Sequence, residues 1–94
     1  MILHTLNKHQ DQALIQRCLK LAGPEDQLLL IEEAVYLVLQ ANEERLSTVM
    51  PVYALEEDVA ARGLQDKLCP NVKLVDYNGF VTLAATADKI QAWF

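Results

Sequence analysis

The unbroken run Leu-Leu-Leu-Ile at residues 28–31 constrains the fold more than any other feature of the sequence. Successive side chains of a strand point to opposite faces of its sheet, so a strand of this composition is buried on both faces. Such strands belong to parallel sheets that carry helices on each side. We therefore expect residues 27–31 to form an interior strand of a parallel sheet.

Short apolar runs alternate with amphipathic stretches along the rest of the chain, which predicts alternating strands and helices. Further strands are expected at residues 2–6, 50–55 and 72–76. Helices are expected at residues 12–22, 33–41, 56–62 and 79–87. The apolar tail at residues 92–94 should dock onto the fold. Since parallel neighbours require right-handed crossovers, residues 1–94 are predicted to form one small α/β domain, a doubly wound three-layer sandwich with a mainly parallel sheet of four to five strands.

Charge and composition exclude several classes of function. The net charge is −5 and the eight basic residues are scattered, so direct binding of nucleic acid is not expected. The turn at residues 7–10 has no glycine and cannot cradle a pyrophosphate. No apolar run is long enough to span a membrane, and the N-terminal residues do not resemble a signal peptide. We expect a cytoplasmic protein.

The chain has two cysteines, Cys18 and Cys69, in neither metal-ligand nor disulfide-framework spacing. We expect no metal and no cofactor. On a helical wheel Cys18 shares the apolar face of its helix with Leu14, Leu21 and Ala22. A thiol in apolar surroundings has a raised pKa, so the pattern favours Cys18 as a buried packing residue over a reactive nucleophile. Cys69 lies at the amino end of the strand expected at residues 72–76. This is the wrong edge of the sheet for a binding or catalytic site.

Polar residues gather where the expected strands end. Ligands of doubly wound proteins bind outside the carboxyl ends of the strands, so this edge is a candidate small-ligand site. The set comprises His4, Thr5, Asn7, Lys8, His9, Glu32, Glu33, Glu56, Asp76, Tyr77 and Asn78. We single out His4, Asn7 and Asp76. Polar residues also occur at strand ends simply because strands meet water there. A histidine between apolar neighbours, such as His4, is often a hydrogen-bonded structural residue. The ligand-site and the structural interpretations therefore both stay open.

The expected second helix is apolar on every side, and a thin domain has little of its own chain to cover such a helix. Its side chains Val35, Tyr36, Val38 and Leu39 are therefore a candidate partner interface. Alternatively, the segment is partly strand, or it lies beneath the loop at residues 40–47 or the C-terminal tail.

Three strings carry a resemblance to a known family: ILHTLNK at residues 2–8, YALEEDVAARGL at residues 53–64 and VDYNGFVTL at residues 75–83. Together with the ending QAWF at residues 91–94, they resemble the DsrH/TusB family of sulfur-relay proteins from end to end. One departure is His9-Gln10, where the family usually has Ser-Pro. This departure bears on where the first helix begins and hence on the exposure of Cys18.

The resemblance implies a cytosolic subunit with a DsrE-like fold that assembles with DsrE/TusD-like and DsrF/TusC-like subunits into a hetero-oligomer. Such complexes pass persulfide sulfur between protein cysteines, towards 2-thiouridine at the tRNA wobble position or, in the Dsr branch, in sulfur oxidation. The principal sulfur-bearing cysteine belongs to the DsrE/TusD partner. Cys18 matches the place where some members carry a cysteine in the first helix, which makes it a candidate persulfide carrier.

Three hypotheses follow from the sequence. The first is an assembly subunit of a sulfur-relay complex that is accessory to catalysis rather than catalytic. The second is an independent thiol sulfurtransferase that uses Cys18 as its persulfide carrier. The third is a small-ligand module at the strand ends. Self-association of the isolated chain stays open in each case.

Overall fold

The computed structural model describes residues 1–39 and 50–93, and within them five strands form one parallel sheet. The strands are β1 (Ile2–Leu6), β2 (Gln27–Leu30), β3 (Val52–Leu55), β4 (Val72–Val75) and β5 (Lys89–Trp93). Their order across the sheet is β4-β3-β2-β1-β5. In register, Leu6 pairs with Leu30 of β2 on one side and with Trp93 of β5 on the other.

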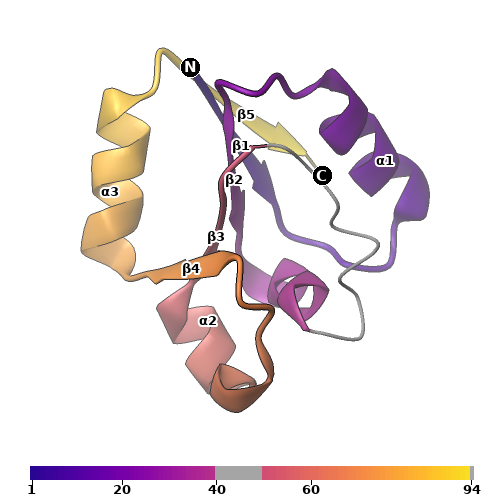
Figure 1. Ribbon diagram of the computed structural model, residues 1–94, viewed down its shortest axis with the longest axis vertical. Coiled ribbons are helices and arrows are strands. Elements are labelled where there is room, and N and C mark those ends of the chain that lie inside the picture. The colour runs from indigo at the N-terminus through magenta and orange to yellow at the C-terminus, as the bar shows by residue number, and fades with distance from the viewer. Residues whose placement is uncertain (40–49, 94) are drawn as a thin grey trace.

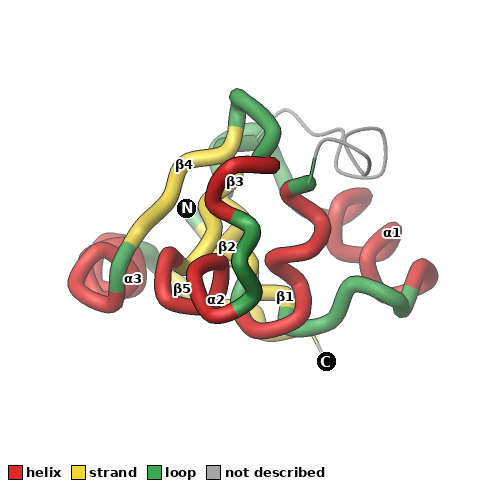
Figure 2. Tube along the Cα trace, turned by 90° about the horizontal axis from the view of Figure 1, so that it is seen from below, coloured by secondary structure: helices red, strands yellow, loops and turns green. Residues whose placement is uncertain are grey.

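The connections between the strands are helical. They are α1 (Gln12–Leu21), the 3₁₀ helix η1 (Glu32–Val38), α2 (Glu56–Ala61), the 3₁₀ turn η3 (Gln65–Lys67) and α3 (Tyr77–Thr86). The chain steps in one direction from β1 to β4 and then returns across the sheet through α3 to place β5 beside β1. Right-handed crossovers therefore put α3 on the face of the sheet opposite α1, as Figures 1 and 2 show. This confirms the predicted doubly wound three-layer sandwich.

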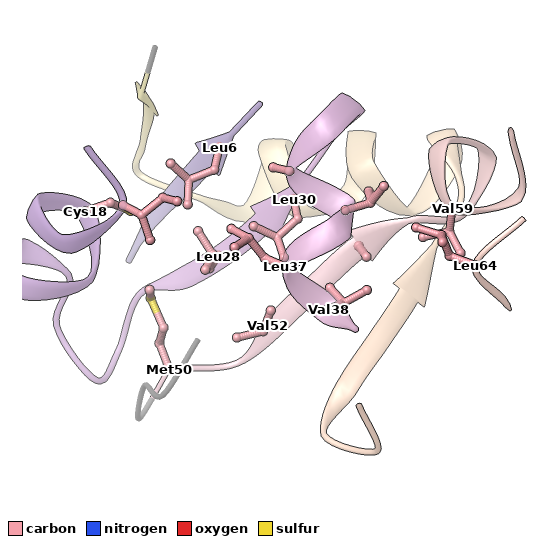
Figure 3. Close-up of a cluster of buried hydrophobic side chains, with 14 residues drawn as sticks. Leu6, Cys18, Leu28, Leu30, Leu37, Val38, Met50, Val52, Val59 and Leu64 are labelled. Carbon is pink, nitrogen blue, oxygen red and sulfur yellow. The ribbon is translucent and has the colours of Figure 1, made fainter. Parts of the chain in front are cut away.

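The side chains of one face of the sheet form the main core together with α1, η1 and α2. We call this face the α1 face and define it by Leu6, Leu28, Leu30, Val52 and Ala54, all of which belong to one buried cluster. The helical elements add buried side chains to this cluster, many of which are labelled in Figure 3; they include Ile15, Cys18, Val35, Leu37, Val38 and Val59. Fully burying a Leu or Val side chain contributes roughly 1.5–3 kcal/mol. The α1 face is therefore the principal source of stability.

The alternate residues of the strands point to the other face, which is covered by α3. We call it the α3 face and define it by Leu3, Thr5, Leu29 and Tyr53. Leu3 and Leu29 are fully buried and Thr5 is nearly so, yet α3 itself has no buried residue. The α3 face is thus less completely covered than the α1 face.

Most differences from the expected elements are shifts of one or two residues at their ends. Helix α3 begins two residues earlier than expected because the Asp76 side chain caps it, accepting a hydrogen bond from the Gly79 N–H at 2.8 Å. Helix α2 ends at Ala61, before Gly63, whose φ of 66° lies in the left-handed region. Ala92 and Trp93 of the expected apolar tail dock as part of the edge strand β5, and residue 94 lies outside the described part.

The expected helix at residues 33–41 is instead the 3₁₀ helix η1, and residues 40 and 41 lie outside the described part. The segment starts with Glu32 at φ 51°, and the Glu32 N–H donates to Asp58 Oδ2 at 2.7 Å. This hydrogen bond to α2 thus helps to hold the backbone conformation of Glu32, the first residue of η1. Among the described residues, no helix is long and apolar enough to cross a membrane.

Candidate functional site

The carboxyl edge of the sheet is the first place to look for a site, because doubly wound proteins bind ligands outside the carboxyl ends of their strands, near the point where the strand order reverses. Strand β1 leads away to β2, whereas β5 reaches the opposite side of β1 through α3. Such a switch point is where doubly wound proteins bind ligands. The residues that follow β1 lie beside this point, so Asn7 and His9 are placed where a site would be expected.

His9 is the centre of a small cluster at this edge. Its Nδ1 lies 4.0 Å from Glu33 Oε2, and its ring lies 5.0 Å from the ring of Tyr36. Asn7 lies two residues before His9 in the sequence. Its Oδ1 atom is buried and has no hydrogen-bond partner among the described residues. The sequence placed His9 and Glu33 at this edge, but only the fold brings Tyr36 to His9.

His4 does not lie at the strand end. It sits in the middle of β1 with 3% of its surface exposed. Its Nε2 is 2.9 Å from Asp26 Oδ2, and its Nδ1 accepts a hydrogen bond from the Trp93 indole N–H at 3.1 Å. An Nδ1 that accepts carries no proton, so the ring is neutral and its Nε2–H donates to Asp26.

Both nitrogens of His4 are therefore engaged in structural hydrogen bonds, and neither faces a ligand. Asp26 also accepts from the N–H groups of Gly23 and Ile2, each at 3.0 Å. The hydrogen bond from His4, followed by those from Gly23 and Ile2, lowers the pKa of Asp26 to about 2. Of the two interpretations of His4, the structure favours the hydrogen-bonded structural residue over a base.

Asp76 is far from His4 and Asn7 in the sheet. It follows β4, and β3 and β2 lie between β4 and β1. Its carboxylate is occupied in capping α3. The structure therefore does not bring His4, Asn7 and Asp76 together, because sequence order along a parallel sheet does not give the lateral order of its strands.

Cys18 has no exposed surface and belongs to the buried cluster of the α1 face, with Ile15 of the same helix. Burial raises the pKa of its thiol to about 12. At neutral pH the thiolate, which is the reactive form, is therefore scarce. The helix face differs from the expected one in Leu21, which is 70% exposed at the end of α1.

Cys69 is also buried, with 3% of its surface exposed. It lies in the loop before β4, and its N–H donates to the Val38 carbonyl at 2.7 Å. Cys18 is a free thiol. Among residues 1–39 and 50–93, no three His, Cys, Asp or Glu side chains form a group that could hold a metal ion.

The predicted partner interface on η1 is largely inside the protein. Val35 and Val38 have no exposed surface, since both point into the cluster of the α1 face. The prediction that they form an uncovered apolar flank is therefore wrong. The physical reason is that η1 packs against β2, β3 and α2, so its own chain covers it. Tyr36 and Leu39 are half-buried and keep some accessible surface.

Exposed apolar side chains occur instead at other places. The large ones are Leu21, Leu74, Tyr77, Val81 and Ile90. Tyr77 and Val81 lie one turn apart on α3, and Ile90 lies on β5, the strand that follows α3. No local pattern in the sequence separates these residues from core residues, because their exposure depends on which elements cover them in the fold.

Comparison with solved structures extends the description of the fold. The solution NMR structure of protein Tm0979 from Thermotoga maritima superimposes with a TM-score of 0.70, at 28% identity, over 90% of this chain and 92% of that one. The crystal structure of the ychN protein from Escherichia coli gives a TM-score of 0.75 over 98% of this chain and 97% of that one. Its identity is 18%, so this likeness concerns the fold alone.

Sequence comparison covers nearly the whole chain. Protein TusB from Escherichia coli strain K12 is 33% identical over 95 aligned positions, which span 98% of this chain and all of that protein. Protein TusB from Buchnera aphidicola subsp. Baizongia pistaciae is 30% identical over the same shares. A family model described as "DsrH like protein" matches residues 9–90. The chain therefore belongs to the DsrH family.

Proposed function

We propose that this chain is an assembly subunit of a cytoplasmic sulfur-relay complex and that its partners, rather than the chain itself, carry the persulfide. The partners are DsrE/TusD-like and DsrF/TusC-like subunits in a hetero-oligomer. The sulfur would serve 2-thiouridine formation at the tRNA wobble position, as the similarity to TusB proteins favours, or sulfur oxidation in a DsrH-like pathway.

The burial of both cysteines is the observation that carries this proposal. In persulfide transfer a thiolate attacks the outer sulfur of a donor persulfide, forms a new S–S bond and releases the donor thiolate. That attack requires an accessible, ionised thiol. Cys18 is inaccessible with a raised pKa, and Cys69 is nearly inaccessible. A family member without a usable thiol contributes to a relay through its contacts.

The surface of the chain supports a role in assembly. Tyr77 and Val81, one turn apart on α3, are both more than half exposed, and neighbouring large apolar side chains at a surface are typical of interaction sites. The half-buried Tyr36 and Leu39 remain candidates for partner contact. Val35 and Val38 do not, since their own fold covers them.

Co-expression tests the assembly role. We expect the tagged chain to co-purify with a DsrE-type and a DsrF-type chain as a complex of fixed stoichiometry. The matched control is each partner expressed with the tag alone. A chain that stays apart from both partners would contradict the proposal.

Persulfide loading tests the accessory role against the independent sulfurtransferase. The native chain is incubated with a persulfide donor, and its intact mass is measured. We expect no gain of a sulfur atom on the native chain, but a gain after denaturation, which shows that the thiols are competent once exposed. A gain on the native chain that disappears in Cys18→Ala but persists in Cys69→Ala would establish Cys18 as a carrier.

A further inference from the structure

One dipeptide at the start of α3 has a chemical reactivity of its own. Asn78 is exposed and is followed by Gly79, and these two residues are the one Asn-Gly pair in the sequence. The backbone nitrogen that follows an asparagine can attack the asparagine side chain. It does so most readily when it belongs to a glycine, because no Cβ shields it and the backbone turns freely. The pair is therefore a candidate site of spontaneous deamidation.

The packing of α3 requires the glycine that makes this pair reactive. A Cβ on residue 79 would lie 2.9 Å from Val75 Cβ, which is closer than such atoms approach one another in proteins. A larger residue at position 79 would therefore push α3 away from β4. The fold keeps glycine beside Asn78 for its small size, and the reactivity of the pair comes with it.

Two features of the folded helix hold the pair unreactive. Asn78 and Gly79 lie in the first turn of α3, and ring closure requires a rotation about the Cα–C bond of Asn78 that a helical backbone does not allow. The Gly79 N–H also donates to Asp76 Oδ1 at 2.8 Å. The nitrogen must lose its proton before it attacks, and a carboxylate beside it disfavours the resulting anion. The reaction therefore requires the first turn of α3 to open.

The first turn of α3 is held by few contacts of its own side chains. None of the ten residues of the helix is buried, and Tyr77, the first of them, is 57% exposed. The Tyr77 N–H donates to Glu57 Oε2 at 3.3 Å, a long hydrogen bond at an exposed position. Elements with few buried side chains open at a lower free energy than the core does. The cap formed by Asp76 is therefore the main local restraint on this turn.

We propose that Asn78-Gly79 is a latent deamidation site, which the Asp76 cap keeps closed and which reacts when the first turn of α3 opens. In the open turn the Gly79 nitrogen loses its proton to solvent and attacks Asn78 Cγ. A new N–C bond forms, the Cγ–Nδ2 bond breaks, and the amide nitrogen takes up a proton from solvent and leaves as ammonia. Water then opens the five-membered succinimide ring to isoaspartate or aspartate. No atom is oxidised or reduced in these steps.

The two products differ in their effect on the helix. Aspartate places a negative charge in the first turn, where the helix dipole favours one. Isoaspartate leads the backbone through Cβ and Cγ and so adds one carbon atom to the main chain, and the turn capped by Asp76 then cannot re-form. One opening event thus becomes a permanent change at the start of α3. This inference does not rest on the sulfur-relay proposal, because the reaction takes place within the isolated chain.

Peptide mapping by mass spectrometry tests the latent site. The full chain is incubated at mildly alkaline pH, and the share of Asn78 converted to aspartate or isoaspartate is followed over time. We expect Asn78 to react roughly tenfold or more faster in the guanidinium-denatured chain than in the native chain. Equal rates in the two states would overturn the proposal, since the fold would then give no protection.

Cap variants test the part played by Asp76. Asp76→Ala should speed deamidation of Asn78 about fivefold, because loss of the cap favours the open turn, and Asp76→Ser should restore most of the protection, since serine also caps helices. The matched control is Asp11→Ala, which removes the hydrogen bond from the Leu14 N–H that caps α1 and should leave the rate at Asn78 unchanged. Circular dichroism checks that each variant keeps its fold. If Asp76→Ala reacts no faster than the wild type or than Asp11→Ala, or if Asp76→Ser reacts as fast as Asp76→Ala, the cap is not what protects Asn78.

Discussion

The two faces of the sheet differ in how completely they are covered, although each strand contributes to both. The α1 face is packed by α1, η1 and α2, and most of its side chains have no exposed surface. The α3 face is covered by α3, which has no buried residue of its own. One face therefore supplies most of the stability, while the other leaves an apolar surface for association.

The physical reason lies in the helices. In α1 the residues Gln16, Arg17 and Lys20 are exposed, whereas Ile15 and Cys18 are buried. The helix therefore has one exposed polar side and one buried apolar side. In α3 the exposed side combines uncharged polar residues, such as Asn78 and Thr82, with the apolar Val81. The outer side of α3 is therefore less polar than that of α1, although it is not apolar throughout.

Neighbouring leucines on β2 offer the largest test of this difference. Leu30 points into the α1 face and Leu29 into the α3 face, and both are fully buried. We expect Leu30→Ala to lower the free energy of unfolding by about 3–5 kcal/mol, because the packed cluster around it cannot collapse into the cavity. Leu29→Ala should cost about 2–3 kcal/mol, since α3 contributes no fully buried side chain to this face and fewer packed neighbours surround the cavity.

Urea denaturation of the two variants and the wild type measures both costs. Equal costs, or a larger cost for Leu29→Ala, would show that the α3 face is as tightly packed as the α1 face.

The second test concerns two hydrogen bonds, one that links Trp93 of β5 to His4 of β1 and one that links His4 to Asp26. The pKa of Asp26 is lowered from 3.8 to about 2 on folding, so its contribution is complete above its unfolded pKa and is lost as pH falls from about 4 to 2. We expect this loss to be on the order of 1–2 kcal/mol.

The measurement is the free energy of unfolding as a function of pH for the wild type and Asp26→Asn. The variant should be less stable at neutral pH and should lose less stability than the wild type between pH 4 and pH 2. If both lose stability in parallel across this window, Asp26 does not anchor β5 through its charge.

The smallest expected effect concerns the close seat of α3 on β4. A Cβ on Gly79 would lie 2.9 Å from Val75 Cβ, which is too close without a shift of the helix. We expect Gly79→Ala to destabilise the fold by about 1 kcal/mol, because the clash outweighs the gain in helix propensity. Gly23→Ala is the control, since its Cβ would lie 3.9 Å from Asp26 Oδ2, an ordinary contact distance, and it should change stability by less than about 0.5 kcal/mol.

Thermal or urea unfolding of the two glycine variants decides the matter. A Gly79→Ala variant more stable than the wild type would mean that α3 is loosely seated and moves aside without cost.

Much of the fold was predictable because it depends on local patterns. The double-sided burial of residues 28–31 indicated a parallel sheet, and the caps and glycines placed the helix ends within one or two residues. The nature of η1 was not predictable, because its backbone is set by the contact between Glu32 and Asp58, which are far apart in the sequence. The separation of Asp76 from Asn7 was not predictable for a similar reason, because strand order depends on long-range pairing.

The sequence by itself determined the class of fold, the packing role favoured for Cys18 and the resemblance to the DsrH family, since apolar periodicity and residue identity are local properties. Only the tertiary structure decided that Val35 and Val38 are inside, that His4 is held between Asp26 and Trp93, and that α3 is left uncovered. Burial and hydrogen bonding depend on which segments meet in space. Val59 of α2, for example, is buried in the cluster of the α1 face, whereas Val81 of α3 is exposed.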